Sequence, residues 1–143
     1  MDAAGTITNT AVVSGGGITP ITVTETIGTE STPILTITKS VSPVPVTENG
    51  TLTYTFLIQN SGSAPADIGT DAVIVDTFNP LLSNLAVSFN GTAWAETTNY
   101  TYDETTGVFT TIAGQITVPA ATYTQNPVTG VWTADPGVST LVV

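Results

Sequence analysis

A chain of 143 residues is long enough for one domain with a core of its own. Charged residues make up 8% and hydrophobic residues 41%, and one basic residue against 11 acidic ones gives a net charge of -10. This balance excludes a phosphate-binding surface, so we expect no nucleic-acid partner, and no run is apolar enough for membrane insertion. With neither Cys nor His, disulfides and the usual metal sites are excluded too, and we expect no metal and no cofactor.

The first 27 residues hold two segments with the alternation of β-strands. Residues 5–13 alternate cleanly, and residues 18–27 follow after a Gly-rich turn at 14–17. Pro20 favours an edge position or a bulge near the start of the second segment. The more apolar face of the first segment carries Ile7, Asn9, Ala11 and Val13.

Residues 34–41, ILTITKSV, form the segment with the most unusual pattern. As a strand, it places Lys39 on the same face as Leu35, Ile37 and Val41. Lys39 is the one basic residue of the whole chain. Because a lysine on an apolar, buried face is rare unless it has a partner, we expect it to have a chemical role or a paired acid.

Two further segments carry strand patterns. Residues 51–60 are the clearest strand, with Leu52, Tyr54, Phe56 and Ile58 on one face. Residues 72–78 alternate as well, but either face has the composition of a buried one. One of these faces is formed by Ala72, Ile74, Asp76 and Phe78, and the other by Val73, Val75 and Thr77.

The remainder of the chain is organised in hairpins. Asn90-Gly91 is a strong two-residue turn signal between segments 85–89 and 93–96. Segments 100–109 and 122–132 resemble one another, each with a Thr-Gly pair that suits a positive-φ turn position. They are interpreted as two ordinary hairpins, with a duplicated binding site as the alternative. So many short strands joined by turn residues predict an all-β fold, an immunoglobulin-like or jelly-roll-like β-sandwich.

Three stretches together resemble a known family. They are LTITKSVSPVPVTENGTLTYTFLIQNSGSAPA, then VIVDTFNP, and ITNTA near the start. The combination is similar to a conserved β-sandwich repeat that occurs in tandem in bacterial and archaeal surface proteins, of the type that forms isopeptide bonds. Residues 34–80 and 5–27 carry the resemblance well, and residues 85–143 more loosely.

The order of the stretches is permuted relative to that repeat. In the family the ITNTA strand and its successor close a repeat, whereas here they open the chain, and STLVV stands last. We therefore expect residues 1–28 to be a donor segment and residues 29–143 a sandwich that lacks its last strands. The linker 28–33 spans at most about 20 Å and an eight-residue strand about 27 Å, so the donor hairpin 5–27 is expected to complete another copy, head to tail.

The resemblance also implies a chemistry, a Lys–Asn isopeptide bond promoted by a nearby acid. Mapped onto this chain, the partners are Lys39 and Asn9, the acid is Asp76, and Glu48 is the reserve acid. Burial would favour an uncharged amine and a protonated carboxyl, and an apolar cage would hold the groups in contact. The reaction happens once per site and modifies the protein itself, so an enzyme is not expected.

Each of these residues has an ordinary alternative. Lys39 can form a salt bridge with Asp76 or Glu48, Asn9 can make hydrogen bonds at a bulge, and Asp76 can be a solvated edge residue.

We expect a structural subunit of a self-assembling fibre or pilus on a prokaryotic cell or spore surface, although the chain begins with no signal peptide. The alternatives are a single module of a large surface adhesin with an intramolecular bond, and a carbohydrate-binding module that uses Trp94, Trp132 and the tyrosines.

Overall fold

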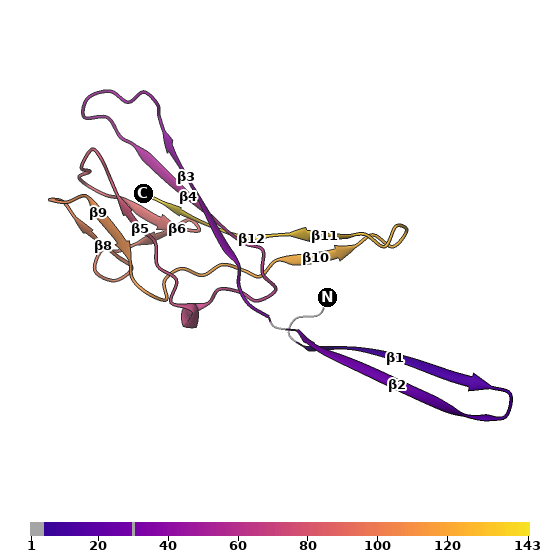
Figure 1. Cartoon of the computed structure of the whole chain (residues 1–143). Coiled ribbons are helices and arrows are strands. Elements are labelled where there is room, and N and C mark those ends of the chain that lie inside the picture. The colour runs from indigo at the N-terminus through magenta and orange to yellow at the C-terminus, as the bar shows by residue number, and fades with distance from the viewer. Residues whose placement is uncertain (1–4, 30) are drawn as a thin grey trace.

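A computed structural model describes residues 5–29 and 31–143, and these residues form an almost entirely β structure (Figure 1). Within these two ranges no helix is long and apolar enough to cross a membrane. The single helical element among the described residues is the short 3-10 helix η1, Ile68–Thr70. The strands are β1 Gly5–Gly15, β2 Ile18–Thr29, β3 Leu35–Ser42, β4 Thr53–Asn60, β5 Val75–Thr77, β6 Val87–Phe89, β7 Thr92–Trp94, β8 Tyr100–Asp103, β9 Val108–Thr111, β10 Thr122–Gln125, β11 Trp132–Asp135 and β12 Gly137–Val142.

Two of the sheets face each other as a sandwich, which confirms the predicted fold class. The larger has the order β3-β4-β12-β6-β7, and the smaller has the order β5-β9-β8. All pairings in both sheets are antiparallel. The core between them is aromatic: Phe78 and Phe109 are fully buried, with ring centroids 5.9 Å apart, and Tyr54 packs against Phe78 at 4.7 Å.

The sandwich is joined along one side and open along the other. On the joined side, the chain passes from β7 into β8 through residues 95–99. Within this connection Glu96 forms an isolated β-bridge with Tyr100. On the other side β3 and β5 are both edge strands, and neither pairs with the other. Each therefore leaves one edge of backbone N–H and C=O groups without a strand partner in the described chain.

The remaining strands form two hairpins that project from the sandwich (Figure 1). In β1–β2 every described side chain from residue 8 to 26 is exposed. In β10–β11 residues 122–135 are exposed as well, although the Tyr123 hydroxyl donates a hydrogen bond to the Ser61 carbonyl at 2.9 Å.

Both hairpins leave the same end of the sandwich, which we call the hairpin pole. Leu35 and Gly137 both pair with Asn60, so the start of β3, which follows β2, lies beside the start of β12, which follows β11. The turn between β3 and β4, residues 43–52, lies at the opposite end, which we call the loop pole (Figure 1). The two ends of the sandwich are therefore different, and the molecule has a direction along its long axis.

Asn60 organises the hairpin pole. Its side chain is fully buried and takes part in four hydrogen bonds. Its Oδ1 accepts from the backbone N–H groups of Ile34 and Gly62, both at 2.9 Å, and its Nδ2 donates to the carbonyls of Ala64 at 2.7 Å and Pro119 at 3.0 Å. One amide thus holds three chain segments together, at residues 34, 60–64 and 119, where the hairpins begin.

Most strand predictions are confirmed. The predicted face of β4 is the buried one, because Tyr54, Phe56 and Ile58 are all less than a tenth exposed. Asn90-Gly91 forms the β6–β7 turn with positive φ at both residues. The two Thr-Gly hairpins also form, with φ of 76° at Gly107 and 71° at Gly130.

Candidate functional site

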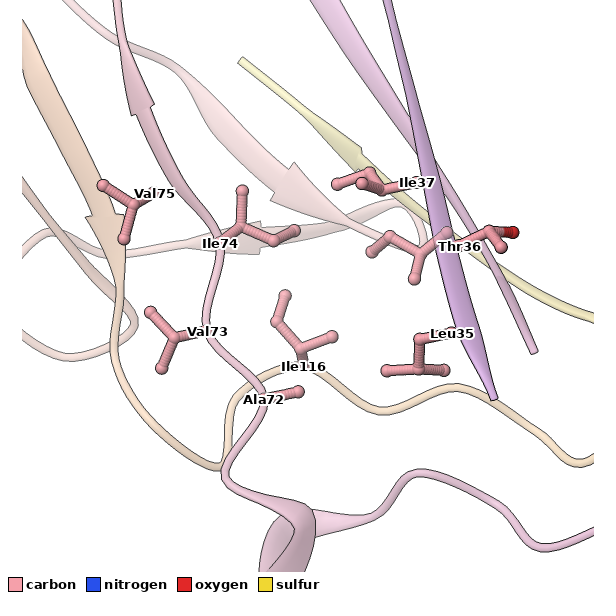
Figure 2. A pocket seen from close by; sticks show the side chains of 9 residues that line it. Leu35, Thr36, Ile37, Ala72, Val73, Ile74, Val75 and Ile116 are labelled. Atoms are coloured by element: carbon pink, nitrogen blue, oxygen red, sulfur yellow. The ribbon is translucent and has the colours of Figure 1, made fainter. Parts of the chain in front are cut away.

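The open side of the sandwich contains an apolar groove of about 270 Å³ (Figure 2). Leu35 and Ile37 of β3 point into it from one side, and Ala72 and Ile74 point into it from the other. The buried Ile116 lies between the two sides. The full lining consists of residues 35–37, Ile58, residues 72–75 and Ile116.

The groove ends at an ion pair towards the loop pole. Lys39, two positions beyond Ile37 on β3, donates a hydrogen bond from Nζ to Oδ2 of Asp76, two positions beyond Ile74 on β5. Since residues 35–39 and 72–76 meet in the same order, the two edges run parallel along the groove. Asp76 therefore belongs to the face with Ala72 and Ile74, which decides between the two faces that the sequence left open.

Three aromatic rings surround the ammonium group of Lys39. Its Nζ lies 4.7 Å from the ring centroid of Tyr54, 5.0 Å from that of Phe78 and 5.5 Å from that of Phe56. Ring faces attract a cation, so they hold the Lys39 ammonium in place together with Asp76. The apolar surroundings predicted for Lys39 are thus present.

The predicted burial of Lys39 is wrong for the single chain. The Lys39 side chain is 37% exposed and that of Asp76 is 20% exposed. Ile37 on the same face is 49% exposed. The reason is the position of β3 at a sheet edge: an alternating pattern identifies the apolar face, but none of the strands in the described residues covers that face.

The Lys39–Asp76 pair has the correct proton count for amide formation. Moving one proton from Nζ to Oδ2 converts the ion pair into a neutral amine, which is a nucleophile, and a carboxylic acid, which is a proton donor. Removing water from such a pair makes its charged form costly, because charged groups are costly to bury.

Asn9 and Glu48 are not brought to this site within the chain. Asn9 lies on β1, exposed, opposite Glu25 of β2, in the hairpin that projects from the hairpin pole (Figure 1). Glu48 is exposed in the turn between β3 and β4. Of the four predicted residues, the described chain therefore joins Lys39 and Asp76.

Comparison with known proteins gave no relative. No protein-family model matches the chain, and neither the curated proteins nor the solved structures contain a significant match. The resemblance to the surface-protein repeat stays a prediction.

One property of the β1–β2 hairpin was not predicted from the sequence. Register places Ala11 opposite Val23 and Val13 opposite Ile21, so both strands contribute apolar residues to the face that carries Asn9, and Glu25 lies on this face opposite Asn9. The other face is formed mostly by threonine: Thr8, Thr10, Thr22, Thr24 and Thr26, together with Val12. The alternating pattern of both strands could have predicted this two-sided hairpin, because the turn between them fixes their register.

The aromatic residues do not form one platform. Trp94 stacks on Phe89 with centroids 4.9 Å apart, and Tyr54 and Tyr100 are buried in the core. Trp132 and Tyr123 are exposed, on one face of the β10–β11 hairpin.

A separate acid has a defined environment in the β8–β9 turn. The Thr105 hydroxyl and backbone N–H both donate to Asp103, at 2.6 and 2.8 Å, and these bonds lower the pKa of the Asp103 carboxyl to about 2. Asp103 thereby stabilises a turn and is not part of the groove.

Proposed function

We propose that this protein is the subunit of a head-to-tail fibre in which the β1–β2 hairpin of one copy fills the groove of the next. The observation that carries this proposal is the pair of unused, matching surfaces. The sandwich has an apolar groove between two edge strands, and the same chain has an amphipathic hairpin packed on nothing in its described part. Insertion would supply strand partners to the free edges of β3 and β5 and cover the groove.

The spacing of residues supports one register for the inserted hairpin. If Asn9 meets Lys39, then Ala11 lies near Ile37 and Val13 near Leu35. Both runs contain four residue steps, about 13 Å. In this register β1 runs antiparallel to β3, and the hairpin tip points towards the hairpin pole of the copy that accepts it.

The direction of insertion gives the assembly its topology. The accepting copy meets the hairpin at its loop pole, while its own hairpin leaves from the opposite end. Such a heterologous contact does not close into a dimer and repeats as a filament. An isologous pair would need the same patch on both copies, whereas here the hairpin and the groove are different surfaces.

The contact would be sealed by an amide bond. The neutral Nζ of Lys39 attacks the side-chain carbonyl carbon of the incoming Asn9, while the Asp76 acid donates a hydrogen bond to its oxygen. Asp76 then accepts a proton from the attacking nitrogen and delivers one to the leaving –NH₂. A C–N bond forms, another breaks, and one ammonia leaves for each bond made, with no redox change.

The test is boiling in denaturant, followed by a gel and intact-mass measurement. We expect a ladder of multiples, each junction lighter by one ammonia. Lys39→Ala and Asn9→Ala should each remove the ladder, whereas Thr10→Ala, on the opposite face of β1, should keep it.

Two other outcomes would overturn the proposal. A single monomer band that lacks one ammonia would mean a bond within one chain, as in a module of a larger adhesin. A monomer of unmodified mass, with no filaments in electron micrographs of the native protein, would exclude both forms of the bond.

A further inference from the structure

The second hairpin, β10–β11, has an exposed apolar face that the proposed strand exchange does not use. Trp132 is 53% exposed, and the nearby turn residues Val128 and Val131 are 91% and 61% exposed. Register places Trp132 on the same face as Tyr123 and Ala134, whereas Thr124 and Thr133 form the opposite face. An exposed cluster of this kind is typical of an interaction surface.

The base of this hairpin is fixed to the hairpin pole. The Tyr123 hydroxyl donates to the Ser61 carbonyl at 2.9 Å, and the Ala121 N–H donates to the Gly62 carbonyl at 2.9 Å. Both acceptors directly follow Asn60, which also binds the Ile34 N–H at the start of β3. The two hairpins therefore leave from neighbouring points and extend from the same end of the sandwich (Figure 1).

Because both hairpins leave from the same pole, the β10–β11 hairpin lies close to the copy that receives β1–β2. A copy that receives β1–β2 is held close to the hairpin pole of the donor, because residues 30–34, which join β2 to β3, span at most about 20 Å. From residue 122 to residue 128 the β10–β11 hairpin extends by about 20 Å as well. Its tip thus reaches the loop pole of the receiving copy, where Val44 is 76% and Val46 is 40% exposed in the turn between β3 and β4.

We propose that β10–β11 is a brace, a second, noncovalent contact in which Trp132 and Val128 of the donor copy pack on the residue 43–46 turn of the receiving copy. This inference rests on the proposed strand exchange. Residues 126–132 and 43–46 contain no charged side chain. A contact between these two segments therefore buries no charge, which would be costly. The brace orients the two sandwiches while the hairpin enters the groove.

The experiment uses two variants that form one junction only. A donor copy with Lys39→Ala keeps its hairpin but cannot be acylated, and an acceptor copy with Asn9→Ala has the reverse defect. When mixed, they form a single covalent dimer, whose rate of appearance is followed on a denaturing gel. This rate reports how well the two copies dock.

The brace predicts effects that depend on the copy. Trp132→Glu in the donor should slow dimer formation about tenfold, since it loses a large apolar contact, and should have no effect in the acceptor, where the brace points away from the junction. Val44→Glu should slow the reaction in the acceptor and not in the donor. Thr124→Glu, on the opposite face of the hairpin, is the control for the added charge and should leave the rate unchanged.

The outcomes separate the brace from the strand exchange. If the parent donor and acceptor form no dimer, the proposed function fails. If they form the dimer but Trp132→Glu has no effect, or slows both copies equally, the brace is overturned. If Trp132→Glu slows the reaction only in the donor but Val44→Glu has no effect in the acceptor, the 43–46 turn is not the surface that the brace contacts.

Discussion

Replacing Asn60 by Ala tests the view that one buried amide holds the hairpin pole together. The substitution removes four hydrogen bonds and leaves the N–H groups of Ile34 and Gly62 and the carbonyls of Ala64 and Pro119 without their partner. An unsatisfied buried group costs about 1–3 kcal/mol, and water entering the vacated space recovers part of the sum. We expect a loss of about 3–5 kcal/mol in the free energy of unfolding.

Urea denaturation followed by tryptophan fluorescence measures this loss. With an m-value of about 2 kcal/mol/M, the midpoint should fall by about 1.5–2.5 M. Asn126→Ala is the matched control: that side chain also accepts two backbone N–H groups, from Val128 and Thr129 at 2.9 and 3.1 Å, but in an exposed turn. Its loss should be about 1 kcal/mol or less, because water replaces the amide there. Equal midpoint shifts for the two variants would refute the reasoning about Asn60.

Three further predictions concern the groove and the β8–β9 turn. Ile37→Asp should leave the melting temperature of the single chain within about 3 °C, because Ile37 is 49% exposed, but should abolish acceptance of a hairpin, because it would bury a charge. Thr36→Asp should allow dimer formation in the two-variant assay, because the Thr36 side chain lies on the opposite face of β3 from Leu35 and Ile37 (Figure 2). Asp76→Ala should still give filaments in electron micrographs, but they should dissociate to monomers of unmodified mass on boiling, and a surviving ladder would exclude Asp76 as the acid. In an NMR titration Asp103 should have a pKa of about 2, and Thr105→Ala should raise this pKa towards 3.8, because the hydrogen bond from the Thr105 hydroxyl lowers it most. The stability that Asp103 contributes is complete above pH 3.8 and is lost as the pH falls towards 2.

Much of the fold could be predicted from the sequence because strand alternation and turn chemistry are local. Tyr54, Phe56 and Ile58 alternate with half-buried or exposed residues in β4, and the turn at Asn90-Gly91 needs the positive φ that both residues adopt. The segment 72–78 was predicted too long. Its regular pairing begins only at Val75, since the Ile74 N–H donates to the Thr111 hydroxyl rather than to a carbonyl of the ladder.

The candidate site was only partly predictable for a different physical reason. Periodicity identified the apolar face of Lys39, and the meeting of Lys39 with Asp76 was among the expected contacts. It could not show that β3 and β5 are both edge strands, because strand order depends on contacts far apart in the chain. The role of Asn60 was missed as well, since an asparagine at a strand end is usually a turn residue.

The presence of a single lysine gives a chemical measure of how far a fibre built in this way has been assembled. Every sealed junction converts the Lys39 amine into an amide, and the sequence contains no second side-chain amine. An amine-reactive dye would then label side chains along a filament only at the subunit whose groove is still empty. Because the α-amino group of each subunit also reacts, the label is counted at Lys39. Labelled Lys39 would mark one end, and its amount per mass of protein would give the mean length of the filaments.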